Sequence, residues 1–336
     1  MKLISFVVPS YNSQEYLHYA LDSLICGGDE IEVLIIDDGS KDDTLKIAQE
    51  YEKKYPNIFK AVHQENKGHG GGINNGLSLA KGKYFKVLDS DDWVDQDSLK
   101  EILSFIRNND EPDLIIANYV YYQGRDNRGF IVKFNHYIEE KKIITFNEVK
   151  PFLLHNNITL HSAMYKTSIL KEAKVELPEH RSYEDNLFVY YPLPFVKKLV
   201  YINTPLYCYL IGREGQSMEQ KNLVKKYYDF VYCGDKIFNL YDITKYKKTN
   251  KGLYRIMLHH LTLNCMLAVI HSRFNGSKEA VSQYKNFIKM AKKNNLKQFR
   301  AVNRKFGFWC ISRRTIFGYL MMKFNVWVAH KVVKYN

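Results

Sequence analysis

Three carboxylates lie within four consecutive residues, in the segment Asp89-Ser90-Asp91-Asp92. Side chains of like charge repel one another at this spacing unless a cation lies among them. Mg²⁺ and Mn²⁺ prefer oxygen ligands, so alternating carboxylates could meet one hard divalent ion and one ribose. The alternative is an acidic turn that caps the following helix, but a position directly after a predicted strand favours the metal site.

A second acidic segment, Asp37-Asp38-Gly39-Ser40, also follows an apolar run. On its own this sequence is typical of a turn with a helix cap. A carboxylate here could instead accept a hydrogen bond from a base N–H or a ribose hydroxyl. Tyr11 could stack on a base beside the Pro9 backbone, or it could be a packed aromatic side chain in a sequence with 26 tyrosines.

The segment from Asn66 to Gly76 holds five glycines. Glycine permits close approach of the backbone to a ligand, so this segment could cradle a phosphate. Its spacing is neither that of a P-loop nor that of a dinucleotide-binding GxGxxG turn. The alternative is a flexible connector.

Two more positions could take part in chemistry. Glu184-Asp185 is either an ordinary helix-start pair or a carboxylate that removes a proton from a hydroxyl group. His161 lies on a predicted strand, where an acceptor-binding role and a purely structural role are both open.

The elements that must position these residues follow a regular alternation. Helical patterns end near residues 26, 54, 81 and 108, and they separate short apolar runs at 3–8, 31–36, 58–64, 83–88 and 113–119. The alternation predicts an α/β fold with a mostly parallel, Rossmann-like sheet flanked by helices. Ligands of such sheets bind beyond the carboxyl ends of the strands. The polar segments at 9–13, 37–40 and 89–93 all begin there, so we expect them to meet on one rim. Residues 151–172 are predicted to form a helix, a strand and a helix.

Four segments, in this order, resemble glycosyltransferase family 2, a family of inverting enzymes with the GT-A fold. They read ISFVVPSYNSQEYLHYALDSLI, EVLIIDDGSKDDTLKIAQEY, ENKGHGGGINNGLSLAKGKYFKVLDSDDW and RSYEDNLFVYYPL. The resemblance covers about residues 3–217. It implies a bacterial cell-surface polysaccharide enzyme, a hexosyl- or N-acetylhexosaminyl-transferase that uses Mg²⁺ or Mn²⁺. The donor would be a nucleotide sugar, commonly a UDP-sugar, and the acceptor a hydroxyl group.

The resemblance also implies roles for individual positions. Asp185 would be the catalytic base and Glu184 would orient it, while Asp91 or Asp92 would bind the metal. The nucleotide sugar would be bound by Pro9, Tyr11, Asp38, Lys67, Asn74, Asp89, Asp91, Arg213, Gln216 and Ser217. Many relatives carry arginine where Ile73 stands, and Lys67 or Arg213 could supply the missing charge near the diphosphate.

The basic residues are concentrated in the last third of the chain. Residues 221–336 hold 24 basic and 4 acidic side chains, whereas the whole chain has a net charge of +13. We therefore predict a GT-A nucleotide-sugar-binding domain over 1–220 and a basic helical domain over 221–336. Lysine and arginine beside aromatic residues at 300–330 predict peripheral contact with an anionic membrane. The alternatives are a solvated basic face, a homo-oligomer contact and a polyanionic acceptor.

The remaining composition narrows the function classes. Five scattered cysteines without a CxxC pair predict neither a disulfide framework nor a zinc site. No apolar run is long enough to span a membrane, and no nucleic-acid motif is present, so we expect no nucleic-acid partner. These features predict a cytoplasmic protein at the inner face of the plasma membrane, acting on a glycan, a lipid-linked glycan or a polyanionic polymer. A non-catalytic glycan- or lipid-binding protein on a degenerate transferase fold is the alternative.

Overall fold

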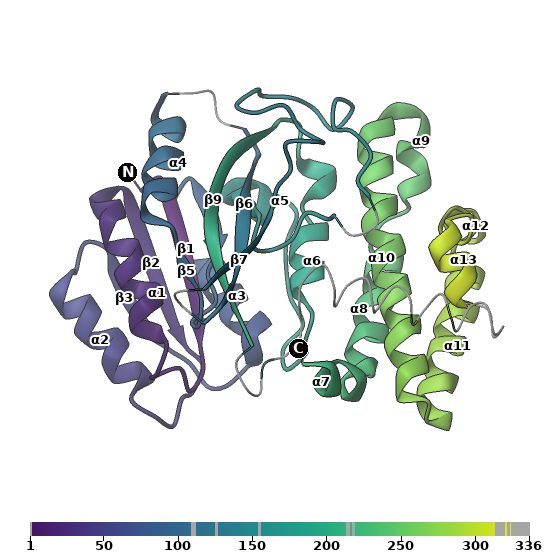
Figure 1. The fold of residues 1–336 in the computed structure, drawn as a ribbon, viewed down its shortest axis with the longest axis horizontal. Coiled ribbons are helices and arrows are strands. Elements are labelled where there is room, and N and C mark those ends of the chain that lie inside the picture. Colours follow the sequence, from purple (N-terminus) through teal and green to yellow (C-terminus); the bar gives the residue numbers. More distant parts are fainter. Residues whose placement is uncertain are drawn as a thin grey trace. The chain divides into compact units, whose positions relative to one another are not determined.

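The computed structural model describes residues 2–108, 112–124, 127–153, 156–212, 216, 219–312, 320 and 323. They form two compact units, one of residues 1–145 and 158–211 and one of residues 146–157 and 212–336 (Figure 1). The predicted domain boundary lay at 220, whereas the segment 146–157 groups with the helical unit. The cause is close packing: a Cβ on Gly252 would lie 2.1 Å from the carbonyl carbon of Phe146.

The first unit is built around one nine-stranded sheet in the order β3-β2-β1-β4-β8-β6-β9-β5, with β7 paired to β6. The strands are β1 (Ile4–Ser10), β2 (Ile31–Asp37), β3 (Phe59–His63), β4 (Tyr84–Val87), β5 (Trp93–Val94), β6 (Leu114–Gln123), β7 (Arg128–Val132), β8 (Ala163–Lys166) and β9 (Leu199–Ile211). Pairings among β1, β2, β3 and β4 are parallel, as is the β6–β9 pairing. The strand predicted within residues 151–172 forms as β8, which inserts antiparallel between β4 and β6. The predicted α/β fold, a sheet flanked by helices and followed by a helical region, is confirmed.

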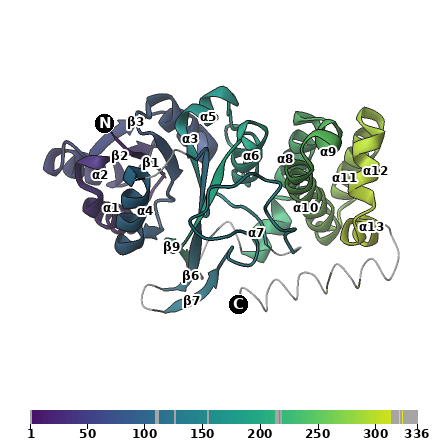
Figure 2. The same cartoon turned by 90° about the horizontal axis from the view of Figure 1, so that it is seen from above.

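Helices cover both faces of this sheet (Figure 2). The chain steps from β1 to β2 and then to β3 through α1 (Leu17–Leu24) and α2 (Thr44–Lys54), and it returns to β4 through α3 (Gly68–Leu79). Because crossovers between parallel strands are right-handed, the return places α3 on the face opposite α1 and α2. The other helices of this unit are α4 (Gln96–Asn108), α5 (Thr167–Glu172) and α6 (Asp185–Tyr190).

The glycine-rich segment is helical rather than a flexible connector. Gly70, Gly71 and Gly72 form the first turns of α3 and are buried. A Cβ on Gly70 would lie 2.6 Å from the carbonyl oxygen of Pro178, and one on Gly76 would lie 2.3 Å from Val7. These glycines therefore let α3 pack directly against β1 and against the segment that precedes α6.

The second unit is helical. Its helices are α7 (Gln220–Lys225), α8 (Tyr227–Leu240), α9 (Tyr246–Thr249), α10 (Lys251–Asn275), α11 (Lys278–Asn294), α12 (Leu296–Asn303) and α13 (Phe306–Ser312). α10 is long and apolar enough to cross a membrane, but 72% of its most apolar window is buried inside the structure. This burial identifies α10 as the core helix of the unit. The helix predicted at the start of 151–172 does not form over residues 151–153 and 156–162.

Candidate active site

The three polar segments predicted to converge do meet at one edge of the sheet. The Ser13 hydroxyl lies 2.7 Å from the Ser90 hydroxyl, which joins the loop after β1 to the turn after β4. The backbone N–H of Asn12 donates to the Ser40 hydroxyl at 3.0 Å, which joins the same loop to the turn after β2. The carboxyl ends of the parallel strands therefore form one polar rim, as in other sheets of this type.

Asp38 caps the start of α3. Its buried carboxylate accepts hydrogen bonds from the backbone N–H groups of Lys67 and Gly68, both at 2.8 Å. The Gln64 amide donates to the same carboxylate at 2.6 Å. These bonds satisfy two of the N–H groups that a helix start leaves free, and they place a negative charge at its positive end. The structure thus gives Asp38 a structural partner on the glycine-rich segment.

His69 links two acidic groups that are far apart in sequence. Its Nε2 lies 2.9 Å from an Asp89 carboxylate oxygen, and its Nδ1 lies 2.7 Å from a Glu184 carboxylate oxygen. Burial would lower the pKa of His69, but the hydrogen bonds to these two carboxylates raise it well above the ordinary value. The rim at the end of β4 is therefore joined through one side chain to the start of α6.

Asp185, the predicted base, follows Glu184 directly and begins α6. Burial and the neighbouring Glu184 charge raise the pKa of Asp185 from 3.8 to about 7, although the charge on His69 acts in the opposite direction. A carboxylate with a pKa near neutrality is suited to general base catalysis, because it is both available and basic at the working pH.

Asp92 is fully buried beneath the rim. Its carboxylate accepts hydrogen bonds from the Tyr207 hydroxyl at 2.6 Å and from the Leu210 backbone N–H at 2.8 Å. Burial, and then the charges of Asp91 and Asp89, raise the pKa of Asp92 well above its ordinary value. A cation beside this group would relieve that repulsion.

One ligand atom from each of Asp89, Asp92 and His161 lies within 4.8 Å of the other two. Burial lowers the pKa of His161 to about 4, so its ring is neutral and keeps a free lone pair. Two carboxylates and one imidazole fit a divalent ion such as Mn²⁺. Asp91 or Asp92 was predicted from the sequence as the metal ligand. Asp91 is half-buried on the same turn, and the geometry adds Asp89 and His161 to the candidates.

Lys86 fixes the segment that carries His161. Its buried Nζ donates to the carbonyl oxygens of Leu160, His161 and Ala163 at 2.7, 2.6 and 3.1 Å. Three acceptors match the three hydrogens of an ammonium group. Burial lowers the pKa of Lys86 to about 7, with the Asp89 charge opposing that shift. The His161 ring also stacks on Tyr209, with ring centroids 4.5 Å apart.

The other residues predicted to bind the nucleotide sugar lie in different surroundings. Tyr11 is 49% exposed on the rim, and Pro9 is buried in β1. Lys67 pairs with Glu179 at 3.2 Å, and the Asn74 side chain bonds the backbone of Leu177 at 2.8 and 2.9 Å. Gln216 belongs to the second unit. Arg213 and Ser217 lie outside the described residues.

His69, Lys86 and Tyr207 were not identified from the sequence. Lys86 could have been identified from the sequence, because a lysine inside an apolar strand needs hydrogen-bond partners when it is buried. His69 is a lone histidine among glycines, and only the folded chain shows its two acidic neighbours. Nothing in the sequence around Tyr207 sets it apart from the other tyrosines.

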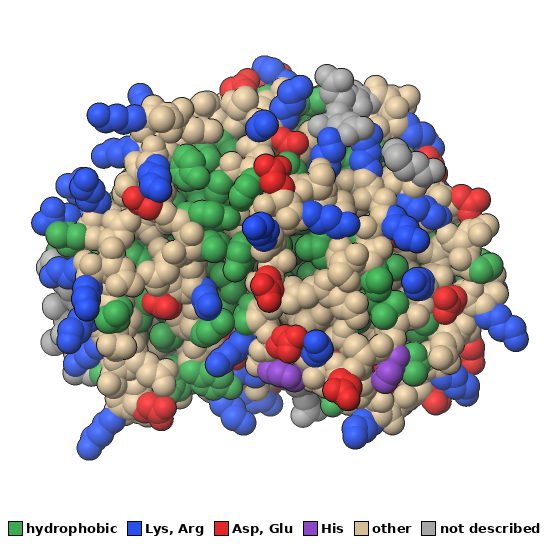
Figure 3. Space-filling view, turned by 180° about the vertical axis from the view of Figure 1, so that it is seen from behind, with side chains coloured by type: hydrophobic (Ala, Val, Ile, Leu, Met, Phe, Trp, Pro, Cys, Tyr) green, Lys and Arg blue, Asp and Glu red, His purple; other side chains and the backbone are tan. Residues whose placement is uncertain are grey.

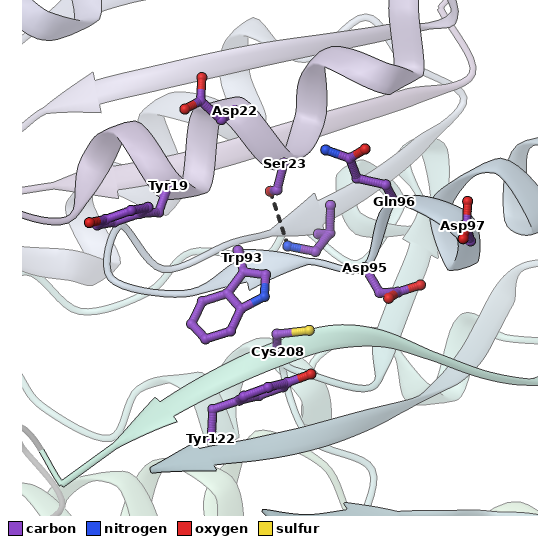
Figure 4. Close-up of a pocket in the computed structure, with 10 residues that line it drawn as sticks. Tyr19, Asp22, Ser23, Trp93, Asp95, Gln96, Asp97, Tyr122 and Cys208 are labelled. Carbon is purple, nitrogen blue, oxygen red and sulfur yellow. Dashed lines mark hydrogen bonds between the residues drawn. The ribbon is translucent and has the colours of Figure 1, made fainter. Parts of the chain in front are cut away.

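A separate cavity of about 480 Å³ lies beside α1 and β5, where Trp93, Cys208 and Tyr122 line one side (Figure 4). Cys208 and Tyr207 are consecutive on β9, so they point to opposite faces of the sheet. The carboxylates of this cavity already have partners: Asp95 caps α4 through Ser98 at 2.9 Å, for example. None of the predicted site residues lines it.

The sheet order and the acidic rim define the class of protein as an α/β protein with a GT-A-type fold. Staphylococcus aureus TarS, residues 1–349, solved in complex with UDP-GlcNAc, shares this fold with a TM-score of 0.64 at 23% identity, and the match covers 91% of both chains. The model of Glycosyl transferase family 2 matches residues 5–173, half of the chain. The chain therefore belongs to glycosyl transferase family 2.

Similar sequences agree with this assignment. Over 221 residues the chain is 32% identical to EpsH of Bacillus subtilis, a match that covers 62% of the chain and 60% of EpsH. Glycosyltransferase GlyG of Streptococcus pneumoniae is 30% identical over 62% of the chain and 70% of GlyG. The poly(ribitol-phosphate) β-N-acetylglucosaminyltransferase TarS of S. aureus is 30% identical over 65% of the chain. The chain spans only 37% of the length of TarS.

Proposed function

We propose that the chain is an inverting glycosyltransferase that moves a sugar from a nucleotide diphosphate to an acceptor hydroxyl group. The observation that carries this proposal is the link from Asp89 through His69 to Glu184, which joins the acidic rim to the residue beside Asp185. Asp185 is the base that takes the proton of the acceptor hydroxyl, since burial and Glu184 bring its pKa to about 7. Attack opposite the leaving diphosphate inverts the anomeric carbon.

Asp89, Asp92 and His161, with Asp91 on the same turn, are the residues that would hold a divalent ion, Mn²⁺ or Mg²⁺. Such an ion, when bound, neutralises the negative charge of a departing diphosphate. Lys86 holds the backbone that carries His161, and Tyr207 holds the Asp92 side chain, through the hydrogen bonds described above.

UDP-sugars are the first donors to test, because the structurally similar TarS was solved with UDP-GlcNAc. The acceptor that we favour is a phosphate-bearing cell-surface polymer. The names of relatives such as TarS support this choice, since TarS acts on poly(ribitol-phosphate). The basic last third of the chain suits an anionic surface, so we propose a position at the inner face of the plasma membrane.

The charge of the second unit also supports an anionic partner. Lys278, Lys285, Lys289 and Lys292 are exposed and lie on one side of α11, opposite its buried residues. We call these four residues the lysine stripe, which extends over about 21 Å at 1.5 Å per residue. Within the described residues none of the four makes an ion pair. Like charges three and four residues apart destabilise a helix by roughly 0.2–0.5 kcal/mol per pair, and a bound polyanion would remove that cost. Basic side chains are scattered over the face of the molecule that Figure 3 shows.

The test is a donor screen. The protein is incubated with UDP-, GDP- and dTDP-sugars and Mn²⁺, and release of nucleotide diphosphate is measured with and without a chelator. We expect one donor to be turned over, with loss of activity in the chelator and in Asp185→Asn. Asp97→Asn is the matched control, because Asp97 is exposed at the start of α4 and pairs only with Lys100 among the described residues. If no donor is bound or hydrolysed, the non-catalytic binding protein becomes the better explanation.

A further inference from the structure

His69 occupies a position between the two halves of the proposed site. It stands in the first turn of α3, and its two ring nitrogens contact Asp89 at the end of β4 and Glu184 at the start of α6. Both partners are carboxylates, which accept hydrogen bonds, so both ring nitrogens donate. Charge-assisted bonds of this kind are shorter and stronger than neutral ones. The imidazole therefore fixes two acidic side chains at once.

The backbone around His69 is held tightly enough to make this contact a rigid one. The N–H of His180 donates to the Lys67 carbonyl at 2.9 Å, and the Asn74 side chain makes two bonds to the Leu177 backbone. Gly70 lies so close to this segment that an added Cβ would meet the Pro178 carbonyl oxygen at 2.6 Å. The first turns of α3 are thus held against residues 177–180 of the segment that leads to α6.

α6 has no side-chain cap of its own. It is six residues long, and its N-cap residue Glu184 makes no capping hydrogen bond. The buried Glu184 carboxylate instead points to His69, and it is only 3% exposed. A short helix without a cap depends on outside contacts for the position of its first turn. Asp185 is the first residue of that turn.

We propose that His69 is a positioning residue, which fixes the start of α6, and with it Asp185, relative to Asp89 on the rim. The inference rests on the proposed function in that it takes Asp185 as the base. Misplacement of a reacting group by about 1 Å can cost roughly 10²-fold in rate. Loss of the His69 side chain should therefore lower kcat far more than it changes donor binding.

The first test compares His69→Ala with wild type and with His63→Ala. His63 is the matched control, because its Nδ1 contacts the Asp37 carboxylate at 2.6 Å outside the Asp89–Glu184 link. We expect His69→Ala to lower kcat about 10²-fold with the donor Kd, measured by calorimetry, within about threefold. Added imidazole should restore part of the activity of His69→Gly. In a double-mutant cycle, His69→Ala should cost little more once Glu184→Gln is present.

A second measurement does not depend on turnover. Amide hydrogen exchange at residues 184–188 should become faster in His69→Ala and stay unchanged in His63→Ala, while exchange in β1 and β2 is the same in all three proteins. If kcat and the exchange at 184–188 both match wild type, the inference is wrong. If wild type turns over no donor but the exchange at 184–188 still depends on His69, the proposed function fails and the positioning contact stands.

Discussion

We predict that Asp185 sets the pH dependence of the proposed sugar transfer. Its pKa lies at about 7 instead of 3.8, first because of burial and then because of the Glu184 charge. A general base works only when it has lost its proton, so kcat/KM should rise with pH and level off above about 7. At pH 5 only about 1% of the carboxylate is ionised, which predicts a rate about 10²-fold below the plateau.

The assay is nucleotide release at subsaturating donor between pH 5 and 9, in buffers of constant ionic strength. Asp185→Asn should give a low rate with no inflection near 7. The same pKa predicts a trend in stability. The folded carboxyl holds its proton up to about pH 7 while the unfolded one loses it near 4, so this group's stabilising contribution falls as pH rises between those values. Urea unfolding of both proteins measures that slope. A kcat/KM inflection near pH 4, or a profile unchanged by Asp185→Asn, would refute the assignment.

Three further changes test the packing and the charged surface. Lys86→Met should lower the free energy of unfolding by roughly 3 kcal/mol in urea, because three buried carbonyl groups lose their donor; the exposed Lys60→Met is the control and should change it little. Gly76→Ala should cost about 1–3 kcal/mol through overpacking against Val7, whereas Ser78→Ala on the exposed side of the same helix should not; equal values would contradict the close contact. Replacing the lysine stripe by glutamine should weaken retention of a phosphodiester polymer at least tenfold at low salt. If vesicles of anionic lipid respond and the polymer does not, a membrane is the partner.

Much of the first unit could be predicted because its residues follow simple periodicities. Apolar runs such as Ile31–Asp37 are buried along nearly their whole length, which is the pattern of a parallel strand between two layers of helices. Because the polar segments follow the ends of parallel strands, their position on one rim could be predicted from the strand pattern alone. β8 was predicted as a strand within residues 151–172, but its antiparallel position between β4 and β6 was not, because a four-residue strand carries no local sign of the distant strands that it pairs with.

The site itself was predictable in its residue types but not in its partners. Asp38 was predicted to bind a nucleotide base, which stays a prediction, and only the folded chain shows that its carboxylate accepts the first N–H groups of α3. The glycine-rich segment was open between a phosphate cradle and a connector. It forms a helix that packs so closely that a Cβ on Gly70 or Gly76 would lie less than 3 Å from Pro178 or Val7. The role of each of these residues depends on which segments pack against each other in the folded chain. The local sequence pattern does not show which segments those are.

The departure at Ile73 can now be understood from the geometry of α3. The family resemblance implies arginine at this position in many relatives, but in this chain Ile73 is completely buried and contributes to the core beneath the rim. Residues four apart lie on the same side of a helix, so His69 occupies the position one turn earlier on that side. Its ring donates to Asp89 at 2.9 Å, which places a cation beside the acidic rim. Lys67, in contrast, is engaged with Glu179. His69 therefore supplies a positive charge to this part of the site from the preceding turn of α3, in place of the arginine that position 73 lacks.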